Sequence, residues 1–414
     1  MMSVQFLPLY IDPGTGSMLF SLFIGIAAAA SFGFRALYLK IKFVLSGGKA
    51  DSASDSKNIP LVIFSDHKRY WNVFEPVCGE FECHGQNLTY YTASPDDPAL
   101  QKKYDFVHAE YLGEKNKPFA KLNFLHADIV LSTTPGLDVY QWKRSRFVKK
   151  YVHIPHSVSD LCGYRMFGLD HYDAVLGTGV NQLGSLRKIE KLRPSLKEKE
   201  FYVAGCTYLD SMKKRLEALP ETVRHEKKTV LVAPSWGKSS ILSRFGDRFL
   251  EALSRTGYEI IIRPHPQSVV SEQNILKPLE EKYSSFEWNY DNDNFDVLSR
   301  ADIMITDFSG VMFDYSLVFD RPFIYADTHF DSSPYDVSWL EEPLWELQIL
   351  PQIGVQLKEE QFPKMKEIIE STMENRELQA ARNRIRDEAW QKRGRASSEV
   401  YDYLMNELNK IEKK

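Results

Sequence analysis

The sequence is poor in cysteine and carries little net charge, and each shortage excludes a class of protein. Four cysteines in 414 residues are too few for a framework of disulfides. The formal net charge is only −4, so no surplus of basic residues is available to hold a nucleic acid, and we expect no nucleic-acid partner. Hydrophobic residues make up 43% and charged residues 26% of the chain, which is typical of a folded globular protein and excludes a disordered or polytopic membrane protein.

One long hydrophobic run stands out, and it lies near the N-terminus. Residues 13–34 carry no charge and, as a helix, would span about 30 Å of hydrocarbon. Three basic residues follow this run, which by the positive-inside rule places the rest of the chain in the cytoplasm: Arg35, Lys40 and Lys42. We therefore expect a single-pass anchor within residues 1–45, in the cytoplasmic membrane, and a cytoplasmic body.

Two alternatives for residues 13–34 stay open. A cleaved signal peptide normally opens with Lys or Arg, which residues 1–11 lack, although the AAAAS stretch suits a signal peptidase. A buried or interfacial hairpin would suit Gly25 and the four alanines. Residues 46–58, SGGKADSASDSKN, are small and polar and predict a flexible linker between the anchor and the body.

The body alternates short apolar runs with helix-prone segments, which is typical of an α/β protein. Predicted strands lie at residues 59–65, 127–133, 151–155, 174–179 and 201–205, and in the second half at 229–235, 258–264, 301–307 and 321–327. A charged, helix-prone stretch, residues 211–228, separates the halves. We expect two Rossmann-like domains facing across a cleft, residues 59–215 and 216–390, followed by a C-terminal helix over residues 391–414.

The segment TDFSGVMFDYSLVFDRP, residues 306–322, joins a buried strand to a predicted helix. The helix is expected to begin near Ser309 and to end at the Asp-Arg-Pro corner. The N–H groups of such a first turn bind phosphate at the carboxyl end of a parallel sheet, where the Ser309 hydroxyl reaches an anion and Gly310 allows close approach. Asp314, one turn further, suits a hydroxylated ligand. The alternative is an ordinary crossover helix that Ser309 caps.

The motif RPHPQ, residues 263–267, follows the predicted strand 258–264. Proline on each side of His265 restricts the backbone and orients the ring. At the carboxyl end of a strand its imidazole can donate to a phosphate or move a proton, and Arg263 can pair with a phosphate in the same place. The alternative is a structural histidine bonded to a loop carbonyl.

A second histidine follows a strand in the first half of the chain. His156 in YVHIPHSVSDL lies beyond Pro155, in the turn after the strand 151–155. If the two halves face each other, His156 and His265 meet from opposite walls of one cleft, as a base for an acceptor and a donor to a leaving phosphate. The alternative for His156 is a place at a helix N-terminus that Ser157 caps.

The segment APSWGKSS, residues 233–240, also follows a strand and offers Ser235, Lys238 and backbone amides to a ligand. GKSS is not a nucleotide-hydrolysing P-loop, because the first glycine of that motif would fall at Val232.

Two further groups of residues give weaker indications of function. Cys78, Cys83 and His84 have poor zinc spacing, so we expect no metal. The basic stretch 141–150 predicts either a contact with anionic lipid or a phosphate polymer, or a solvated surface turn.

Three motifs in this order and spacing resemble the CDP-glycerol glycerophosphotransferases of teichoic acid synthesis: VLVAPSW, IIRPHPQ and ADIMITDFSGVMFDYSLVFDRPFIYAD. The resemblance covers residues 230–327. It implies a GT-B fold at the cytoplasmic membrane face, with the acceptor domain first and the nucleotide-donor domain second. That family usually attaches to the membrane peripherally, so an N-terminal anchor departs from its pattern.

The resemblance also implies roles for individual residues. His265 matches the histidine of the family's RPHP-like motif, and His156 is the nearest equivalent of the histidine in its HGTP-like motif, so both are expected to be catalytic. The family's serine–serine–aspartate segment for donor phosphates matches Ser309, Gly310 and Asp314. Two positions depart from the family pattern, because serine replaces glycine after His156 and Gly310 lacks the second serine hydroxyl. Arg263, Ser235 and Lys238 complete the expected donor-binding set.

Together these features predict a membrane-anchored transferase. It would move glycerol phosphate, or a related polyol phosphate, from CDP-glycerol to a hydroxyl of a cell-envelope polymer or lipid-linked acceptor and release CMP. CDP-glycerol would be the donor substrate, and we expect no cofactor. Two alternatives stay open: a GT-B glycosyltransferase of capsule or envelope polysaccharide that uses a CMP- or UDP-sugar, and a non-catalytic membrane scaffold with a degenerate transferase fold.

Overall fold

The computed structural model describes residues 58–220, 227–291, 293–333 and 335–413. The residues from 58 onward form one compact unit. The predicted anchor at residues 13–34 and all but the last residue of the predicted linker lie outside the described residues. Across the part of the chain that is described, no helix is both long enough and apolar enough to cross a membrane.

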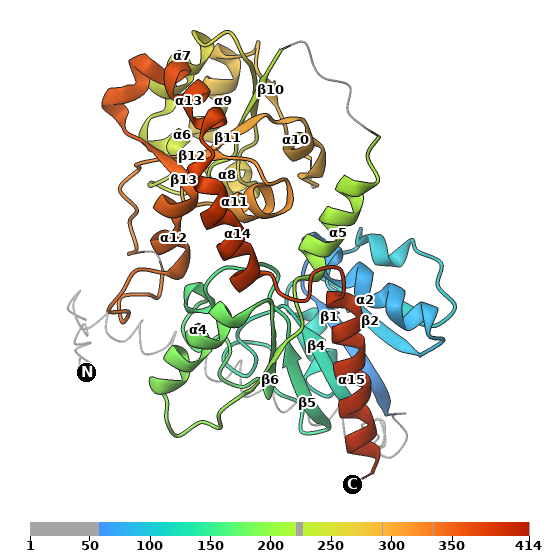
Figure 1. The fold of residues 1–414 in the computed structure, drawn as a ribbon. Coiled ribbons are helices and arrows are strands. Elements are labelled where there is room, and N and C mark those ends of the chain that lie inside the picture. The colour runs from blue at the N-terminus through green and yellow to red at the C-terminus, as the bar shows by residue number, and fades with distance from the viewer. Residues whose placement is uncertain (1–57, 221–226, 292, 334, 414) are drawn as a thin grey trace, which may run out of the picture. The chain divides into compact units, whose positions relative to one another are not determined.

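Two fully parallel sheets organise this unit (Figure 1). The first has the strand order β3-β2-β1-β4-β5-β6-β7. Its strands are β1 (Ile59–Ser65), β2 (Leu88–Thr92), β3 (Val107–Tyr111), β4 (Ala127–Ser132), β5 (Val148–His153), β6 (Ala174–Gly177) and β7 (Glu200–Val203). The alternation along β1 sends Leu61 and Ile63 into one hydrophobic cluster and Val62 and Phe64 into another, so both faces of the sheet are covered.

The second sheet has the strand order β10-β9-β8-β11-β12-β13. Its strands are β8 (Thr229–Val232), β9 (Glu259–Ile262), β10 (Glu287–Trp288), β11 (Ile303–Thr306), β12 (Phe323–Ala326) and β13 (Gly354–Leu357). In each sheet the chain starts at a central strand, builds outward on one side and then returns to build the other. The order therefore reverses between β1 and β4 and between β8 and β11, and ligands bind at the carboxyl ends of such strands.

Helices connect nearly all of these strands. The α-helices are α2 (Trp71–Cys83), α3 (Lys117–Leu122), α4 (Val180–Lys191), α5 (Thr207–Glu217), α6 (Ile241–Arg244), α7 (Gly246–Ser254), α8 (Pro266–Ser271), α9 (Gln273–Lys282), α10 (Phe295–Arg300), α11 (Val311–Phe313), α12 (Trp345–Ile353), α13 (Met365–Glu374), α14 (Glu377–Ala389) and α15 (Ala396–Glu412). Short turns of 3₁₀-helix are η1 (Lys68–Tyr70), η2 (Pro98–Leu100), η3 (Leu161–Gly163) and η5 (Glu359–Lys364), and η4 (Asp314–Val318) is a π-helix.

All nine predicted strands are present, most of them shorter than predicted at their carboxyl ends. Four strands were not predicted. β2 (LTYYT) mixes aromatic and polar residues, and the edge strand β3 (VHAEY) is largely exposed. β10 has two residues and β13 (GVQL) begins with a glycine, so neither forms an apolar run. The predicted C-terminal helix over 391–414 begins later, at Ala396, after a turn.

The C-terminal segment returns to the first sheet (Figure 1). α15 buries Val400 and Leu404 in the same hydrophobic cluster as β1 and α2. The crossing from α14 passes directly over Gly179, where a Cβ would lie 2.1 Å from the Glu388 carbonyl oxygen. Gln391 N–H donates to the Thr178 carbonyl (3.0 Å) and fixes the crossing there. A side chain at position 179 would therefore separate the returning segment from the first sheet.

Replacing Gly179 with Ala should lower the free energy of unfolding by about 2 kcal/mol, since the new methyl group meets backbone on both Glu388 and Ala389. Gly184→Ala is the matched control. It lies in the same helix, α4, and a Cβ there has no neighbour within 4 Å. Its helix propensity should raise stability by up to about 1 kcal/mol. Equal denaturation midpoints for the two variants would contradict the close crossing.

Candidate active site

A cavity of about 540 Å³ opens at the carboxyl ends of strands from both sheets. It brings together six of the eight predicted site residues: His156, Arg263, His265, Ser309, Gly310 and Asp314. His156 follows β5 of the first sheet, whereas the other five follow β9 and β11 of the second. The site is therefore built from two sheets, and each sheet supplies one of the two histidines.

His265 has a defined orientation because it caps a helix. It is the N-cap of α8, and its Nδ1 accepts a hydrogen bond from Gln267 N–H (3.1 Å). Burial, and then the nearby Arg69 guanidinium, lower the pKa of His265 to about 4. At neutral pH the ring is thus uncharged, and since Nδ1 accepts, the proton is on Nε2. His265 is therefore a hydrogen-bond donor and not a base.

His156 is held in a more enclosed place. Its ring packs against Tyr70 (ring centroids 5.2 Å apart) and lies near Tyr164 (6.4 Å). Burial, and then Arg69, lower the pKa of His156 to about 4, so it is also neutral. Its Nδ1 is buried and has no hydrogen-bond partner among the described residues. Because its ring is neutral, His156 has one unprotonated nitrogen that can accept a proton.

The turn before α11 differs from the prediction. The helix begins at Val311, not near Ser309, and its N-cap is Gly310, with no side chain capping it. After one short turn it continues as the π-helix η4, because the Asp314–Val318 segment bonds one residue further along the chain. The first bond of the turn joins Met312 N–H to the Ser309 carbonyl (3.1 Å), so the N–H groups of Gly310 and Val311 precede it.

Asp307 fixes this turn against the loop that follows β8. Its carboxyl oxygens accept from the N–H groups of Ser235 (2.8 Å), Ile241 (3.1 Å) and Ser309 (3.1 Å). Burial raises the pKa of Asp307 to about 6, while the hydrogen bonds from the N–H groups of Ser235 and Ile241 lower it. One carboxyl group thus positions both loops at the point where the strand order of the second sheet reverses.

Asp314 lies in the cavity wall with partners from the protein itself. Its Oδ2 accepts from the Tyr208 hydroxyl (2.9 Å) and from Asn294 Nδ2 (3.0 Å). Burial raises the pKa of Asp314 to about 6, while these two hydrogen bonds lower it. The other oxygen, Oδ1, can accept a hydrogen bond from a ligand hydroxyl. This one oxygen is enough for the predicted role of Asp314, which is to bind a hydroxylated ligand.

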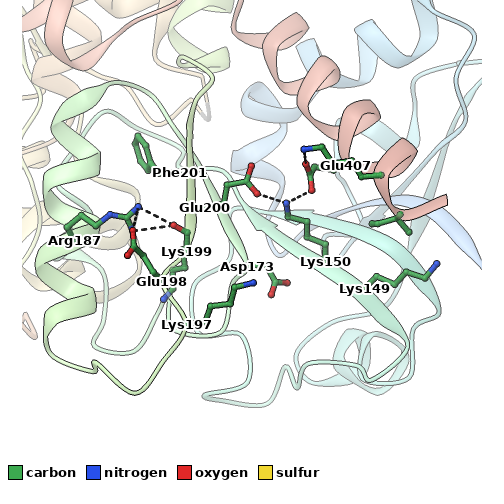
Figure 2. Close-up of a pocket in the computed structure, with 12 residues that line it drawn as sticks. Lys149, Lys150, Asp173, Arg187, Lys197, Glu198, Lys199, Glu200, Phe201 and Glu407 are labelled. Atoms are coloured by element: carbon green, nitrogen blue, oxygen red, sulfur yellow. Dashed lines mark hydrogen bonds and ion pairs between the residues drawn. The ribbon is translucent and has the colours of Figure 1, made fainter. Parts of the chain in front are cut away.

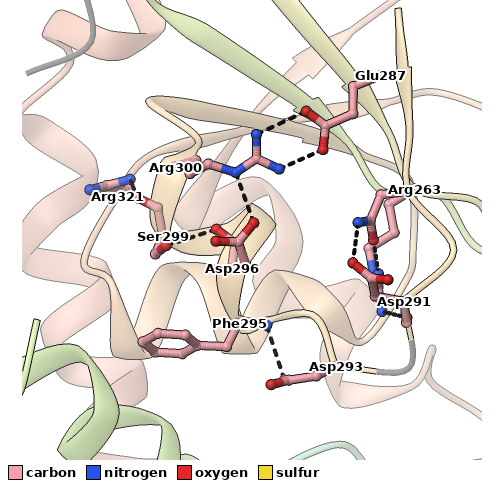
Figure 3. A network of polar contacts seen from close by, with 10 residues as sticks. Arg263, Glu287, Asp291, Asp293, Phe295, Asp296, Ser299, Arg300 and Arg321 are labelled. Carbon is pink, nitrogen blue, oxygen red and sulfur yellow. Dashed lines mark hydrogen bonds and ion pairs between the residues drawn. The ribbon is translucent and has the colours of Figure 1, made fainter.

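Arg263 is also held by neighbours (Figure 3). It donates to Asn289 Oδ1 through Nη1 and to the Asp291 carbonyl through Nη2 (2.7 Å). Burial lowers the pKa of the guanidinium, and the acidic groups around it counteract this. The same loop is braced by Arg300, which bonds the Glu287 carboxylate through both terminal nitrogens (2.8 and 2.5 Å). Arg263 is thus a fixed positive charge at the cavity.

The remaining two predicted residues do not line the cavity. Ser235 is buried, and it contributes its backbone N–H to Asp307. Lys238 is exposed and lies near Asp331, whose pKa is lowered first by hydrogen bonds from Ser333 and only last by this lysine. Only Ala233 and Pro234 of the APSWGKSS segment reach the cavity.

The cavity is also lined by residues that were not predicted, among them Arg69, Tyr70 and Glu346. Arg69 and Tyr70 come from SDHKRY, directly after β1, and Arg69 lowers the pKa of both histidines. Glu346 is at the start of α12, and burial raises its pKa to about 7. The position of SDHKRY after a predicted strand was the available signal for Arg69. Nothing in the sequence around Glu346 indicated it.

A second cavity, of about 590 Å³, lies at the amino ends of β5 and β7 (Figure 2). Its cations are largely neutralised by neighbouring acids. Lys150, for example, pairs with Glu200 (2.7 Å) and with Glu407 (2.5 Å). This charge balance, and its position away from the carboxyl ends of the strands, do not favour an anion site.

Some residues of the basic stretch 141–150 and of the cysteine cluster have structural roles. Trp142 is buried against Phe64 (ring centroids 5.0 Å apart), and Arg144 pairs with Asp173 (2.6 Å). Cys78 is fully buried in the core, whereas Cys83 is exposed. The described residues contain no group of three or more His, Cys, Asp and Glu side chains placed to hold a metal ion.

Comparison with solved structures shows the fold. The wall teichoic acid polymerase TagF matches with a TM-score of 0.59 and 16% identity, over 92% of this chain and 98% of that chain. UDP-GlcNAc 2-epimerase from Neisseria meningitidis matches with a TM-score of 0.51 and 13% identity, over 84% of this chain and 99% of that one. At such identities the likeness concerns the arrangement of the two sheets, and it confirms the predicted GT-B-like α/β fold.

Comparison with sequence families is more specific. Residues 207–406, just under half of the chain, match the family model described as CDP-Glycerol:Poly(glycerophosphate) glycerophosphotransferase. No curated protein sequence matches the chain. The matched segment contains the second sheet, His265 and the Ser309–Asp314 turn. The match over residues 207–406 supports a CDP-glycerol glycerophosphotransferase-like enzyme.

Proposed function

We propose that this enzyme transfers glycerol phosphate, or a related polyol phosphate, from CDP-glycerol to a hydroxyl group of a cell-envelope polymer or lipid-linked acceptor. One observation carries the proposal: a neutral histidine from each sheet lines the same cavity as Arg263 and the Ser309–Gly310 turn. Hydrogen-bond donors and a fixed cation on one side suit a diphosphate, and a neutral imidazole on the other suits an acceptor hydroxyl.

On the donor side, His265 acts through its Nε2–H. The hydrogen bond from Gln267 N–H to Nδ1 keeps the proton on Nε2. That N–H, the Arg263 guanidinium and the backbone N–H groups of Gly310 and Val311 stabilise the negative charge that grows on the diphosphate oxygens as the bond to the leaving group breaks. Asp314 accepts a hydrogen bond from a hydroxyl of the transferred polyol.

On the acceptor side, His156 takes the proton of the attacking hydroxyl group. The acceptor oxygen forms a new bond to the β-phosphorus, and the bond between that phosphorus and the bridging oxygen breaks. CMP leaves with the bridging oxygen, and His156 later gives its proton to solvent. Because its pKa is lowered, His156 is too weak a base to deprotonate a free hydroxyl group. The hydroxyl becomes acidic enough only as its oxygen bonds to phosphorus, so proton transfer accompanies the attack.

The place of the reaction in the cell is part of the proposal. An uncharged segment at residues 13–34 followed by basic residues supports a single-pass anchor in the cytoplasmic membrane, with the enzyme on the cytoplasmic side. CDP-glycerol is a cytoplasmic type of substrate because it is a charged nucleotide, and a lipid-linked acceptor would be reached from that face. The proposal requires no cofactor.

The donor is tested by ligand protection against heating. CDP-glycerol at about 100 times its Kd should stabilise the protein by about 2.7 kcal/mol, whereas CDP-ribitol, CMP-sugars and UDP-sugars should protect less. Preferential protection by a CMP- or UDP-sugar would replace the proposal with a GT-B glycosyltransferase. Protection by none of these nucleotides would favour a non-catalytic scaffold.

The role of His265 is tested with two amide variants. His265→Asn should keep the cap on α8, because asparagine is a good N-cap, but it lacks a donor at the Nε2 position. CMP release should fall by about 100-fold or more. His265→Gln places an N–H near the Nε2 position, so it should lose less activity despite losing the cap. Normal turnover by His265→Asn would remove this histidine from the reaction.

The neutral state of His265 is tested by NMR with ¹³C-labelled histidine. The ring signal that disappears in His265→Asn should titrate near pH 4, because burial and Arg69 lower its pKa to about 4. The same signal in denaturant should titrate near the ordinary value of about 6.5. Near-UV circular dichroism at each pH verifies that the protein is still folded. A midpoint at pH 6 or above in the folded protein would contradict a neutral, buried ring.

A further inference from the structure

Gly310 leaves an open position in the cavity wall, and a serine from the other sheet faces it. A Cβ at residue 310 would have one neighbour within 4 Å, the Ser159 hydroxyl oxygen, at 3.7 Å. The backbone of Gly310 is right-handed helical (φ −59°, ψ −16°), so any side chain could occupy this position without strain. Ser159 follows β5 of the first sheet and lines the same cavity.

The Ser159 hydroxyl is available to a ligand. Among the described residues it takes part in no hydrogen bond, although the backbone of the same residue does. Its N–H lies 3.4 Å from Ser157 Oγ, and its carbonyl accepts from Gln182 Nε2 (2.9 Å). Gln182 also donates to the Ser157 carbonyl (2.9 Å). The backbone of residues 157–160, here called the 157–160 loop, is therefore fixed while its Ser159 side chain is left unpaired.

A reciprocal pair of carboxylates fastens this loop to the second sheet. Glu346 Oε2 accepts from Asp160 N–H (3.1 Å), and Asp160 Oδ2 accepts from Trp345 N–H (3.0 Å). Glu346 thus accepts from the backbone of Asp160 itself, and Asp160 accepts from the backbone of the residue that precedes Glu346. Burial raises the pKa of Glu346 to about 7, and the nearby Asp160 carboxylate adds to this, so Glu346 can accept the hydrogen bond with or without its proton.

We propose that Ser159 is a donor-binding residue that gives its hydroxyl hydrogen to a phosphate oxygen held at the Ser309–Gly310 turn, and that Asp160 and Glu346 are positioning residues that hold it there. This inference rests on the proposed function. The diphosphate is then bound from both sheets at once, by Gly310 N–H from the second and by Ser159 from the first. Its affinity depends on how the 157–160 loop is fastened.

A double-mutant cycle tests Ser159. Ser159→Ala should lower kcat/KM for CMP release from CDP-glycerol by about tenfold, as expected for loss of one hydrogen bond to a charged group. Gly310→Ser keeps the backbone N–H that binds phosphate and adds a hydroxyl that faces Ser159, so its own kcat/KM is measured as the second single variant of the cycle. In the Ser159→Ala background, Gly310→Ser should restore most of the lost kcat/KM, since it supplies a hydroxyl from the other wall.

The control is Ser271→Ala, the same change at an exposed serine in α8 outside the cavity. Melting temperatures verify folding, and Ser159→Gly serves as a second variant if Ser159→Ala does not fold. Equal kcat/KM for Ser159→Ala and Ser271→Ala, or no restoration by Gly310→Ser, would overturn the inference. Failure of the wild-type enzyme to release CMP would overturn the proposed function instead.

The positioning residues are tested by conservative and non-conservative changes. Glu346→Gln keeps an oxygen that accepts from Asp160 N–H and should retain KM for CDP-glycerol, whereas Glu346→Ala should raise it with a smaller effect on kcat. Glu342→Gln is the control, because Glu342 is exposed and makes only a loose ion pair with Lys188 (3.4 Å). An equal KM for Glu346→Ala and Glu342→Gln would show that the carboxylate pair positions nothing.

Discussion

The candidate site depends first on a single buried carboxyl group. Asp307 receives the N–H groups of Ser235, Ile241 and Ser309. Without that acceptor, three backbone donors at the end of β11 and in the loop after β8 would be buried and unpaired, which proteins avoid. The shape of the Ser309–Gly310 turn is therefore fixed by Asp307, which does not line the cavity. Residues in front of it remain available to a ligand.

This arrangement also explains why Ser235 was assigned to the wrong side of its loop. From the sequence, Ser235 follows a strand and is expected to face a ligand, as Ser309 does. In the structure the loop turns so that Ser235 gives its N–H to Asp307, while Pro234 reaches the cavity. The pattern of hydrophobic residues predicts where a strand ends. Which way the next residue points depends here on a hydrogen-bond acceptor, Asp307, that follows a different strand.

The sequence was most informative where local chemistry decides the structure. His265 is placed by the prolines beside it and by its own cap on α8, so its position could be predicted from five consecutive residues. Long apolar strands were predicted for the same reason, because burial on both faces leaves a continuous apolar run. The edge strands β3 and β13 were missed, since one exposed edge permits polar residues.

Contacts between distant segments could not be predicted in this way. Glu346 meets Asp160 from 186 residues away, and Ser159 meets Gly310 across the two sheets. Gly179 is a similar case: its need for glycine arises from the returning chain at Glu388. Even the helix expected near Ser309 begins two residues later, because Gly310 and not a side chain forms its cap.

The charges around the cavity indicate how a diphosphate would change the site. In the free enzyme Arg69 contributes to the depressed pKa of both His156 and His265, and no nearby acid fully offsets it. A bound diphosphate brings negative charge close to the same rings and raises their pKa values. His156 would therefore become a stronger base only once the donor is seated, so the acceptor hydroxyl is activated in the presence of the phosphate it attacks. If Ser159 and Glu346 connect donor binding to the 157–160 loop, which directly follows His156, the contacts that hold the diphosphate would also hold the base in place.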